Sequence, residues 1–226
     1  MPQAGLKTAC EAVLFDLDGT LIDSAPDLAG AGNDMRRARG LEPLPYERFR
    51  PWVGSGARGM LGIALQVDPG EPEFLSLRDE FLALYEARMT RETKIFDGIT
   101  ETLDALVALR VPWGIVTNKA ARFAEPVVRA LGLAPTRAAL ICGDTLARAK
   151  PFPDPLIEAA RRLAVPPESC VYVGDDLRDV QAGRAASMAT AVAAWGYLGA
   201  EGPVEAWGAD CIIERPALVL NRLGLA

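Results

Sequence analysis

The chain of 226 residues contains no histidine. This absence excludes the Ser-His-Asp triad, the HExxH zinc site, phosphohistidine chemistry and every mechanism in which an imidazole gives or takes a proton. Any proton transfer that the protein carries out must therefore use carboxylates or the side chains of Lys, Tyr or Cys.

Long hydrophobic runs are also missing, although half of the residues are hydrophobic. None of the apolar runs approaches the ~20 residues that a membrane-spanning helix needs. Residues 1–9 hold one Lys and no apolar block, which argues against a signal peptide. We therefore expect a cytoplasmic protein without a membrane partner.

Positive charge and cysteine are scarce. The formal net charge is −6 and the pI is about 4.9, so the chain is a poor candidate for binding the nucleic-acid backbone, which requires clustered Lys and Arg. A few local cations can still bind a small anion. The four cysteines are widely separated and form no C-x-x-C pair, which is typical of free thiols in a reducing compartment.

Short apolar runs alternate with segments of helical periodicity. The runs predicted as strands are 12–16, 113–117, 138–142 and 170–174, with weaker ones at 190–193 and 211–213. The segments predicted as helices are 98–109, 122–131, 155–163 and 177–186. Near-continuous apolar strands that alternate with helices indicate a doubly wound, Rossmann-like α/β fold with a parallel sheet.

One stretch interrupts this alternation. Residues 24–92 contain no convincing strand, and helical periodicity is visible at 26–39, 57–65 and 72–90, with Pro-rich and Gly-rich breaks between them. The sequence therefore predicts an α/β core made of residues 1–23 and 93–226, with residues 24–92 inserted after the first strand.

Carboxylates gather at the ends of the predicted strands. Asp16 and Asp18 end the first strand, and Asp175 and Asp179 follow the 170–174 run. Ligands of open parallel sheets bind outside the carboxyl ends of the strands, so we expect these side chains to meet at one edge. Mg²⁺ prefers such oxygen ligands, and all four aspartates are candidate ligands.

The same residues suit phosphoryl transfer. Asp16 can attack phosphorus and form an aspartyl-phosphate. Asp18, two residues on, is placed to protonate the leaving oxygen and then to deprotonate the attacking water.

Four further residues are candidate phosphate-binding groups. Gly19 lets the main chain come close to the phosphoryl oxygens. Thr117 and Asn118 follow the second strand and can donate hydrogen bonds, and Lys150, in a Pro-rich loop, can neutralise charge.

These motifs, in this order, resemble those of the haloacid dehalogenase superfamily. They read DLDGT at 16–20, TN at 117–118, K-P at 150–151 and GDDxxD at 174–179. The resemblance implies that Asp16 is the nucleophile and Asp18 the general acid/base. It makes Asp175 a metal ligand and Asp179 a metal-site partner, and it makes Lys150 and Thr117 phosphate ligands. Residues 24–92 correspond to the helical cap of that family.

Two features indicate the branch of the superfamily. The dehalogenating branch lacks the second aspartate, so the presence of Asp18 favours phosphoryl chemistry. The phosphonate-cleaving branch uses a cap lysine, and residues 21–92 contain none. A phosphatase acting on a small phosphorylated metabolite is therefore expected, with a sugar phosphomutase and a non-catalytic binding protein on the same fold as alternatives.

Within the phosphatases, two families are similar. WVGSGA at 52–57 resembles the cap loop of bacterial phosphoglycolate phosphatases, and WGIVTNKAARFAEP at 113–126 resembles the N-acetylmuramic acid 6-phosphate phosphatases. Arg58 is the candidate in the cap for contacting the substrate. The resemblance therefore implies phosphoglycolate phosphatase first and N-acetylmuramic acid 6-phosphate phosphatase as an alternative, and the choice between a monomer and a homodimer stays open at this point.

Overall fold

The computed structural model describes residues 10–136, 139–199 and 202–225, and at its centre lies a sheet of six parallel strands. The spatial order is β5-β4-β1-β6-β7-β8, so the first strand of the chain lies near the middle. The strands are β1 (Ala12–Phe15), β4 (Trp113–Val116), β5 (Leu140–Ile141), β6 (Cys170–Gly174), β7 (Ala189–Ala193) and β8 (Cys211–Ile213).

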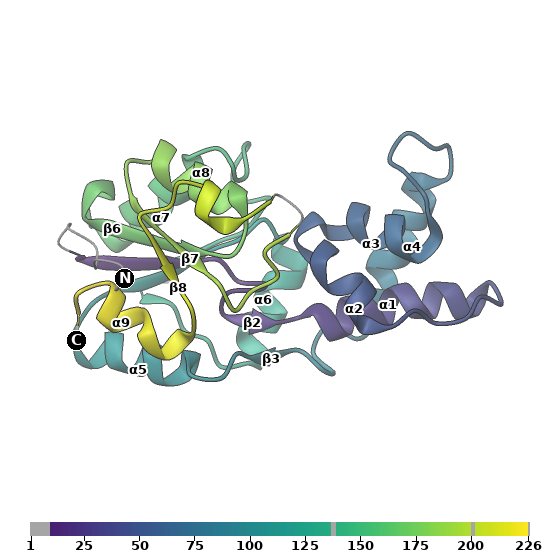
Figure 1. Cartoon of the computed structure of the whole chain (residues 1–226), viewed down its shortest axis with the longest axis horizontal. Helices are drawn as coiled ribbons and strands as arrows, with labels where there is room; N and C mark the ends of the chain where they lie inside the picture. The colour runs from purple at the N-terminus through teal and green to yellow at the C-terminus, as the bar shows by residue number, and fades with distance from the viewer. Residues whose placement is uncertain (1–9, 137–138, 200–201, 226) are drawn as a thin grey trace.

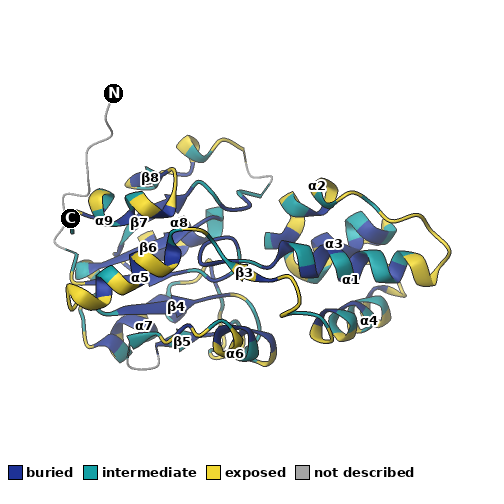
Figure 2. Cartoon of the chain, turned by 90° about the horizontal axis from the view of Figure 1, so that it is seen from below, coloured by how far each residue is buried: buried dark blue, intermediate teal, exposed yellow. Residues whose placement is uncertain are grey.

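Both faces of the sheet are buried, as Figure 2 shows for the dark blue central strands. Successive residues of a strand point to opposite faces. Val13 and Phe15 accordingly belong to one apolar cluster, and Ala12 and Leu14 belong to another. This explains why the sequence shows continuous apolar runs rather than alternation.

Helices on each face supply the partners of these strands. Residues of α5 (Ile99–Ala108), α6 (Ala121–Ala130) and α9 (Val219–Arg222) join the first cluster, and residues of α7 (Asp154–Leu163) and α8 (Leu177–Ala185) join the second. Short 3₁₀ helices lie at η3 (Pro167–Ser169), η4 (Val204–Ala206) and η5 (Pro216–Leu218). The predicted doubly wound α/β fold is confirmed.

The inserted residues form a helical unit beside the sheet (Figure 1). We call residues 24–92 the cap. Its helices are α1 (Ala25–Ala38), α2 (Tyr46–Phe49), η1 (Arg50–Ser55), α3 (Gly56–Leu65) and α4 (Phe74–Glu86). They pack around their own apolar cluster, which includes Met35, Phe49 and Phe81, all fully buried. Core residues Phe123 and Tyr197 also join that cluster, so the cap packs against the core.

Two connections between cap and core pair with each other. β2 (Ile22–Asp23) runs antiparallel to β3 (Lys94–Ile95) and forms a separate two-stranded sheet. This ribbon was not predicted, because two-residue strands carry no detectable periodicity. The segment that leads from the core to the cap therefore lies beside the segment that returns to the core.

Several predicted boundaries differ from the structure by a few residues. The last cap helix runs from Phe74 to Glu86 rather than over 72–90, and α2 was not predicted. The predicted strand 138–142 begins at Ala138, which lies outside the described residues, as do residues 1–9, on which the expectation of no signal peptide rests.

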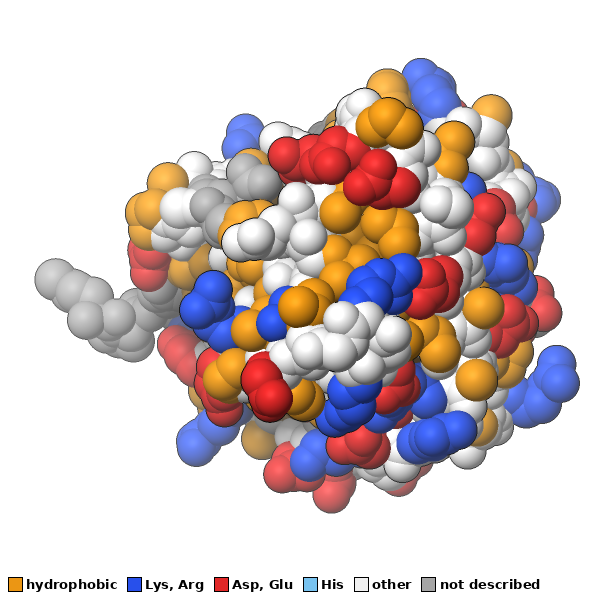
Figure 3. Space-filling model, turned by 90° about the vertical axis from the view of Figure 1, so that its right-hand side faces the viewer, with side chains coloured by type: hydrophobic (Ala, Val, Ile, Leu, Met, Phe, Trp, Pro, Cys, Tyr) orange, Lys and Arg blue, Asp and Glu red, His pale blue; other side chains and the backbone are white. Residues whose placement is uncertain are grey.

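Three further features concern the surface, the helices and the cysteines. On the outer face of the cap, basic and acidic side chains are interspersed (Figure 3). Among the described residues, no helix is both long enough and apolar enough to cross a membrane. All four cysteines are free.

Asp27 of α1 binds residues 92–93, where the chain returns from the cap to the core. Its carboxylate is fully buried and accepts hydrogen bonds from the main-chain N–H of Glu92 (3.0 Å) and of Thr93 (2.9 Å) and from the Thr93 hydroxyl (2.8 Å). Arg88 lies 3.6 Å away. One carboxylate thus satisfies three donors that would otherwise be buried without partners.

We expect Asp27→Ala to lower the free energy of unfolding by about 3 kcal/mol, because it leaves the buried main-chain N–H and hydroxyl of Thr93 without their acceptor. Urea denaturation measures this. Asp34→Ala is the matched control, since Asp34 on the same helix is 36% exposed and should contribute about 1 kcal/mol or less. Equal losses in the two variants would contradict the role given to Asp27.

Candidate active site

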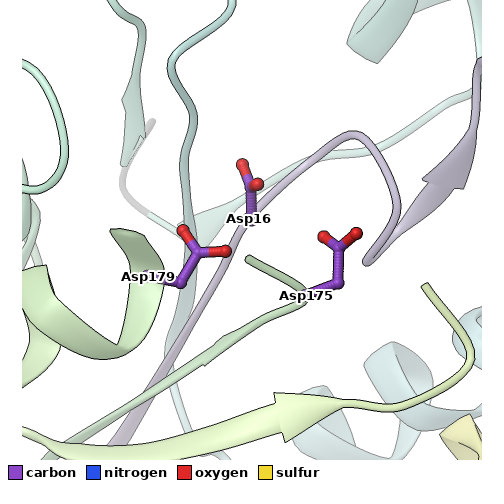
Figure 4. A group of neighbouring side chains, drawn as sticks. All are labelled: Asp16, Asp175 and Asp179. Atoms are coloured by element: carbon purple, nitrogen blue, oxygen red, sulfur yellow. The ribbon is translucent and has the colours of Figure 1, made fainter. Parts of the chain in front are cut away.

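Parallel strand topology brings the motif residues together at the carboxyl edge of the sheet. Asp16 follows β1, Asp175 follows β6, and Asp179 lies in the first turn of α8. One carboxylate oxygen of each lies within 4.8 Å of the others, and Figure 4 shows the three side chains next to one another. The predicted meeting of these three aspartates is therefore observed.

Each carboxylate is held by specific donors. Asp175 accepts from the Thr20 hydroxyl (2.9 Å) and from the main-chain N–H of Tyr197 (2.8 Å). Asp179 accepts from the main-chain N–H of Asp176 (3.0 Å), as part of the capping box of α8. The oxygens are thus oriented by the surrounding fold before any ligand arrives.

Lys150 lies between two of the carboxylates. Its ammonium is 2.9 Å from Asp16 and 2.7 Å from Asp179, and it also donates to the main-chain carbonyl of Val116 (3.1 Å). Tyr172 accepts from the same ammonium at 2.8 Å. Burial lowers the pKa of Lys150, but Asp16 and Asp179 outweigh this and raise its pKa above the ordinary value.

One cation does not balance three buried carboxylates. Burial raises the pKa of Asp16 to about 7, although Lys150 opposes the shift. Burial, together with the charges of Asp16 and Asp179, raises the pKa of Asp175 well above its usual range. Clustered oxygen donors with excess negative charge fit a hard divalent cation such as Mg²⁺.

The side chain of Asp18 does not join this group. Its two carboxylate oxygens face the ammonium of Lys119, at 2.9 and 3.1 Å, and one of them also accepts from the hydroxyl of Ser24. The candidate metal-binding carboxylates are therefore those of Asp16, Asp175 and Asp179. Asp18 stays at the mouth of the site as a candidate acid/base.

The predicted phosphate-binding residues have mixed outcomes. Thr117 is buried beside the site, and its hydroxyl accepts from the main-chain N–H of Lys119 at 3.1 Å. The amide of Asn118 instead makes two hydrogen bonds to the main chain of Lys150, at 2.9 and 3.0 Å. Asn118 therefore positions the lysine loop, a contact that its place in the motif did not reveal.

Gly19 has a steric role that differs from the expected one. Its φ is +84°, and a Cβ there would lie 2.1 Å from a carboxylate oxygen of Asp175. Only glycine combines this backbone conformation with such a close approach. Gly19 therefore allows the turn after β1 to bring Asp16 and Asp175 together.

A cavity of about 300 Å³ opens from the carboxylates toward the cap. Its core side includes the site residues, and its cap side is apolar, formed by Leu28, Val53, Ala57, Phe81, Leu82 and Tyr85. Arg122 and Arg178 also line it. The predicted substrate contact, Arg58, is exposed and does not line the cavity.

A family model for haloacid dehalogenase-like hydrolases matches residues 10–187. The chain belongs to the haloacid dehalogenase-like hydrolase family. The match covers β1 to α8, and hence every motif residue described above.

Relatives of this hydrolase match nearly all of its length. An N-acetylmuramic acid 6-phosphate phosphatase from Pseudomonas aeruginosa is 41% identical over 216 residues, 96% of each chain. A phosphoglycolate phosphatase from Xylella fastidiosa is 46% identical over 208 residues, 92% of this chain and 90% of its own. The crystal structure of a predicted phosphoglycolate phosphatase from Haemophilus somnus has a TM-score of 0.82 at 26% identity, covering 96% of this chain and 99% of that one.

Sequence reasoning missed several residues of this hydrolase's site. Lys119 directly follows the TN motif, and that adjacency was the available signal. Tyr197 offered none: it contacts Asp175 through its main-chain N–H, and its hydroxyl donates to Asp23 at 3.0 Å. Arg178 donates to the cap carbonyl of Gly54 and is paired with Asp176.

We expect Asp175→Asn to stabilise the metal-free hydrolase at pH 8 by about 3 °C in melting temperature, because it removes one of three crowded charges. A carboxyl whose pKa rises on folding stabilises the native state below its ordinary value of 3.8, and this contribution disappears as the pH rises through the folded pKa, about 7 for Asp16. The advantage of the variant should therefore shrink toward pH 5.

The same thermal measurement with Mg²⁺ tests the metal site. The wild-type protein should gain at least about 3 °C, and Asp175→Asn should gain little. Asp104→Asn, on an exposed position of α5, is the matched control and should behave as the wild type. An identical Mg²⁺ response in Asp175→Asn would exclude Asp175 as a ligand.

Proposed function

We propose that the chain is a Mg²⁺-dependent phosphomonoesterase that works through an aspartyl-phosphate on Asp16. The observation that carries this proposal is the convergence of Asp16, Asp175 and Asp179 with Lys150 at one sheet edge, with Asp18 at the mouth of the same cavity. Acid/base and nucleophilic groups are therefore available without histidine.

Mg²⁺ would be held by the carboxylates of Asp16, Asp175 and Asp179. When bound, it offsets their mutual repulsion and the repulsion between an anionic nucleophile and an anionic phosphate. Lys150 contributes a positive charge 2.9 Å from Asp16, and the Thr117 hydroxyl, which lines the same cavity, would donate to the phosphoryl oxygens.

The reaction has two displacements at phosphorus. In the first, an oxygen of Asp16 forms a bond to phosphorus while the ester bond breaks, and Asp18 gives a proton to the leaving alkoxide. In the second, Asp18 takes a proton from water as the water oxygen attacks phosphorus, and the bond to Asp16 breaks. Inorganic phosphate leaves, and both aspartates return to their starting states.

The substrate proposed first is 2-phosphoglycolate. Phosphoglycolate phosphatases are among the relatives at 46% identity, and the cap loop 52–57 resembles theirs. The cationic side chain of Arg122 lines the cavity and suits a small substrate with a carboxylate.

A second candidate is N-acetylmuramic acid 6-phosphate, and the cavity favours it specifically. The volume of about 300 Å³ corresponds to about ten water molecules in the liquid, more than the glycolate portion of 2-phosphoglycolate would displace. The apolar cap side would suit the acetyl and lactyl methyl groups of the amino sugar. Relatives with this activity in their names are 41% and 42% identical.

We expect Asp16→Asn to lower kcat for phosphate release at least about a thousandfold, because the amide oxygen is a poor nucleophile. Circular dichroism should show an unchanged fold, since the two side chains have the same shape. Asp104→Asn again serves as the control for loss of a carboxylate. Near-wild-type turnover in purified Asp16→Asn would overturn the nucleophile assignment.

Phosphate release from the two candidate substrates, measured side by side, decides between them. With Mg²⁺ we expect 2-phosphoglycolate to be the better substrate by at least about tenfold in kcat/KM, and EDTA to abolish both activities. The opposite preference would select the amino sugar. Turnover that depends on an added sugar bisphosphate would indicate the phosphomutase alternative, and turnover unaffected by EDTA would refute the metal site.

A further inference from the structure

Lys119 is a buried cation that the reaction as described above does not use. Its side chain is 8% exposed, and its ammonium contacts both carboxylate oxygens of Asp18, at 2.9 and 3.1 Å. The main chain around it is fixed on both sides, by the hydrogen bond to Thr117 and by its carbonyl, which accepts from Gly143 at 2.9 Å. The main chain that carries this side chain is therefore fixed by the core.

The cap supplies the second partner of this ammonium. The ring of Tyr85, on α4, lies with its centroid 4.7 Å from the Lys119 nitrogen, within the range of a cation–π interaction. Tyr85 is 2% exposed and its ring also contacts Phe123 of the core, at 5.5 Å between centroids. Burying an ammonium is unfavourable unless it is paired, so Lys119 gains from the cap ring as well as from Asp18.

The two carboxylate oxygens of Asp18 accept different numbers of hydrogen bonds. Ser24 and Lys119 both donate to one oxygen, and Lys119 alone reaches the second. The Asp18 carboxylate is thus held by Ser24, at the start of the cap, and by Lys119, which follows the TN motif. Its orientation depends on contacts that come from two separate parts of the chain.

We infer that Lys119 is a positioning residue that holds Asp18 for proton transfer to the leaving oxygen, and that Tyr85 of the cap holds Lys119 in turn. The inference rests on the proposed acid/base role of Asp18. The cap would then affect proton transfer, because the ring that contacts the Lys119 ammonium belongs to the cap helix α4. Lys119 is then held in place for Asp18 when α4 packs against the core, as it does here.

The dependence of the rate on the leaving group separates this role from a merely structural one. An alkoxide leaving group needs a proton from Asp18, whereas p-nitrophenolate leaves readily without one. The alkyl ester is whichever of 2-phosphoglycolate and N-acetylmuramic acid 6-phosphate the wild type hydrolyses faster. We expect Lys119→Met to lower kcat/KM, which reports only on the steps up to departure of the leaving group, about a hundredfold for that ester and less than about fivefold for p-nitrophenyl phosphate.

Variants of the cap partner test the second half of the inference. Tyr85→Leu removes the ring and should lower kcat/KM for the alkyl ester about tenfold more than for p-nitrophenyl phosphate. Tyr85→Phe keeps the ring and should retain the wild-type ratio of the two rates. Lys94→Met, which removes an exposed lysine, is the matched control for the loss of a positive charge.

The outcomes are distinguishable. Equal losses on both esters in Lys119→Met and Tyr85→Leu, with an active wild type, would overturn the inference and leave the proposed function standing. A wild type that hydrolyses neither ester, or an Asp18→Asn variant that slows both equally, would overturn the proposed function and this inference with it. A selective loss on the alkyl ester in both variants, restored in Tyr85→Phe, is the expected result.

Discussion

Three carboxylates and one ammonium are buried together at the carboxyl edge of the sheet, and their charges do not balance. Lys150 contacts two of the carboxylates directly, while Asp175 is held by the Thr20 hydroxyl and the main-chain N–H of Tyr197. Burial and the nearby negative charges raise the pKa values of Asp16 and Asp175. Keeping these carboxylates ionised side by side is therefore unfavourable. Such a cluster lowers stability, and in the proposed function the same excess of negative charge is what would bind a divalent cation.

Close packing of the main chain makes this crowding possible. Gly19 and Gly196 lie on either side of Asp175, and a Cβ at Gly196 would lie 2.2 Å from the Cβ of Asp175 and 2.5 Å from the carbonyl oxygen of Gly19. Both turns therefore require glycine for different reasons, one for its φ and one for space. The loop that contains Gly196 also receives Arg50 of η1, whose guanidinium donates to the Gly196 carbonyl at 2.8 Å. The turn that packs against Asp175 is thus tied to the cap.

The cap is joined to the core by few but specific contacts. Arg178 reaches the carbonyl of Gly54, Arg50 reaches the loop after β7, and Tyr85 covers Lys119. The β2–β3 ribbon holds the two connections together at the base. This arrangement leaves the cavity as the space between two separately packed units, so the cap residues define its far wall. Its size and apolar character are accordingly features of the cap, while the reacting groups come from the core.

The sequence by itself determined the fold class, the presence of an inserted helical segment and the three aspartates that meet at one edge of the sheet. Buried parallel strands leave continuous apolar runs, and each motif residue directly follows such a run, so chain order and strand topology together place Asp16, Asp175 and Asp179 at one edge. Only the tertiary structure decided that Asp18 faces Lys119 rather than the other carboxylates, that Asn118 holds the lysine loop and that Arg58 lies outside the cavity. The reason is physical: these outcomes depend on side-chain contacts between distant segments, such as the pair of Asp18 and Lys119, 101 residues apart. Periodicity and spacing report only on neighbours along the chain, and they say nothing of which distant side chain fills a given space.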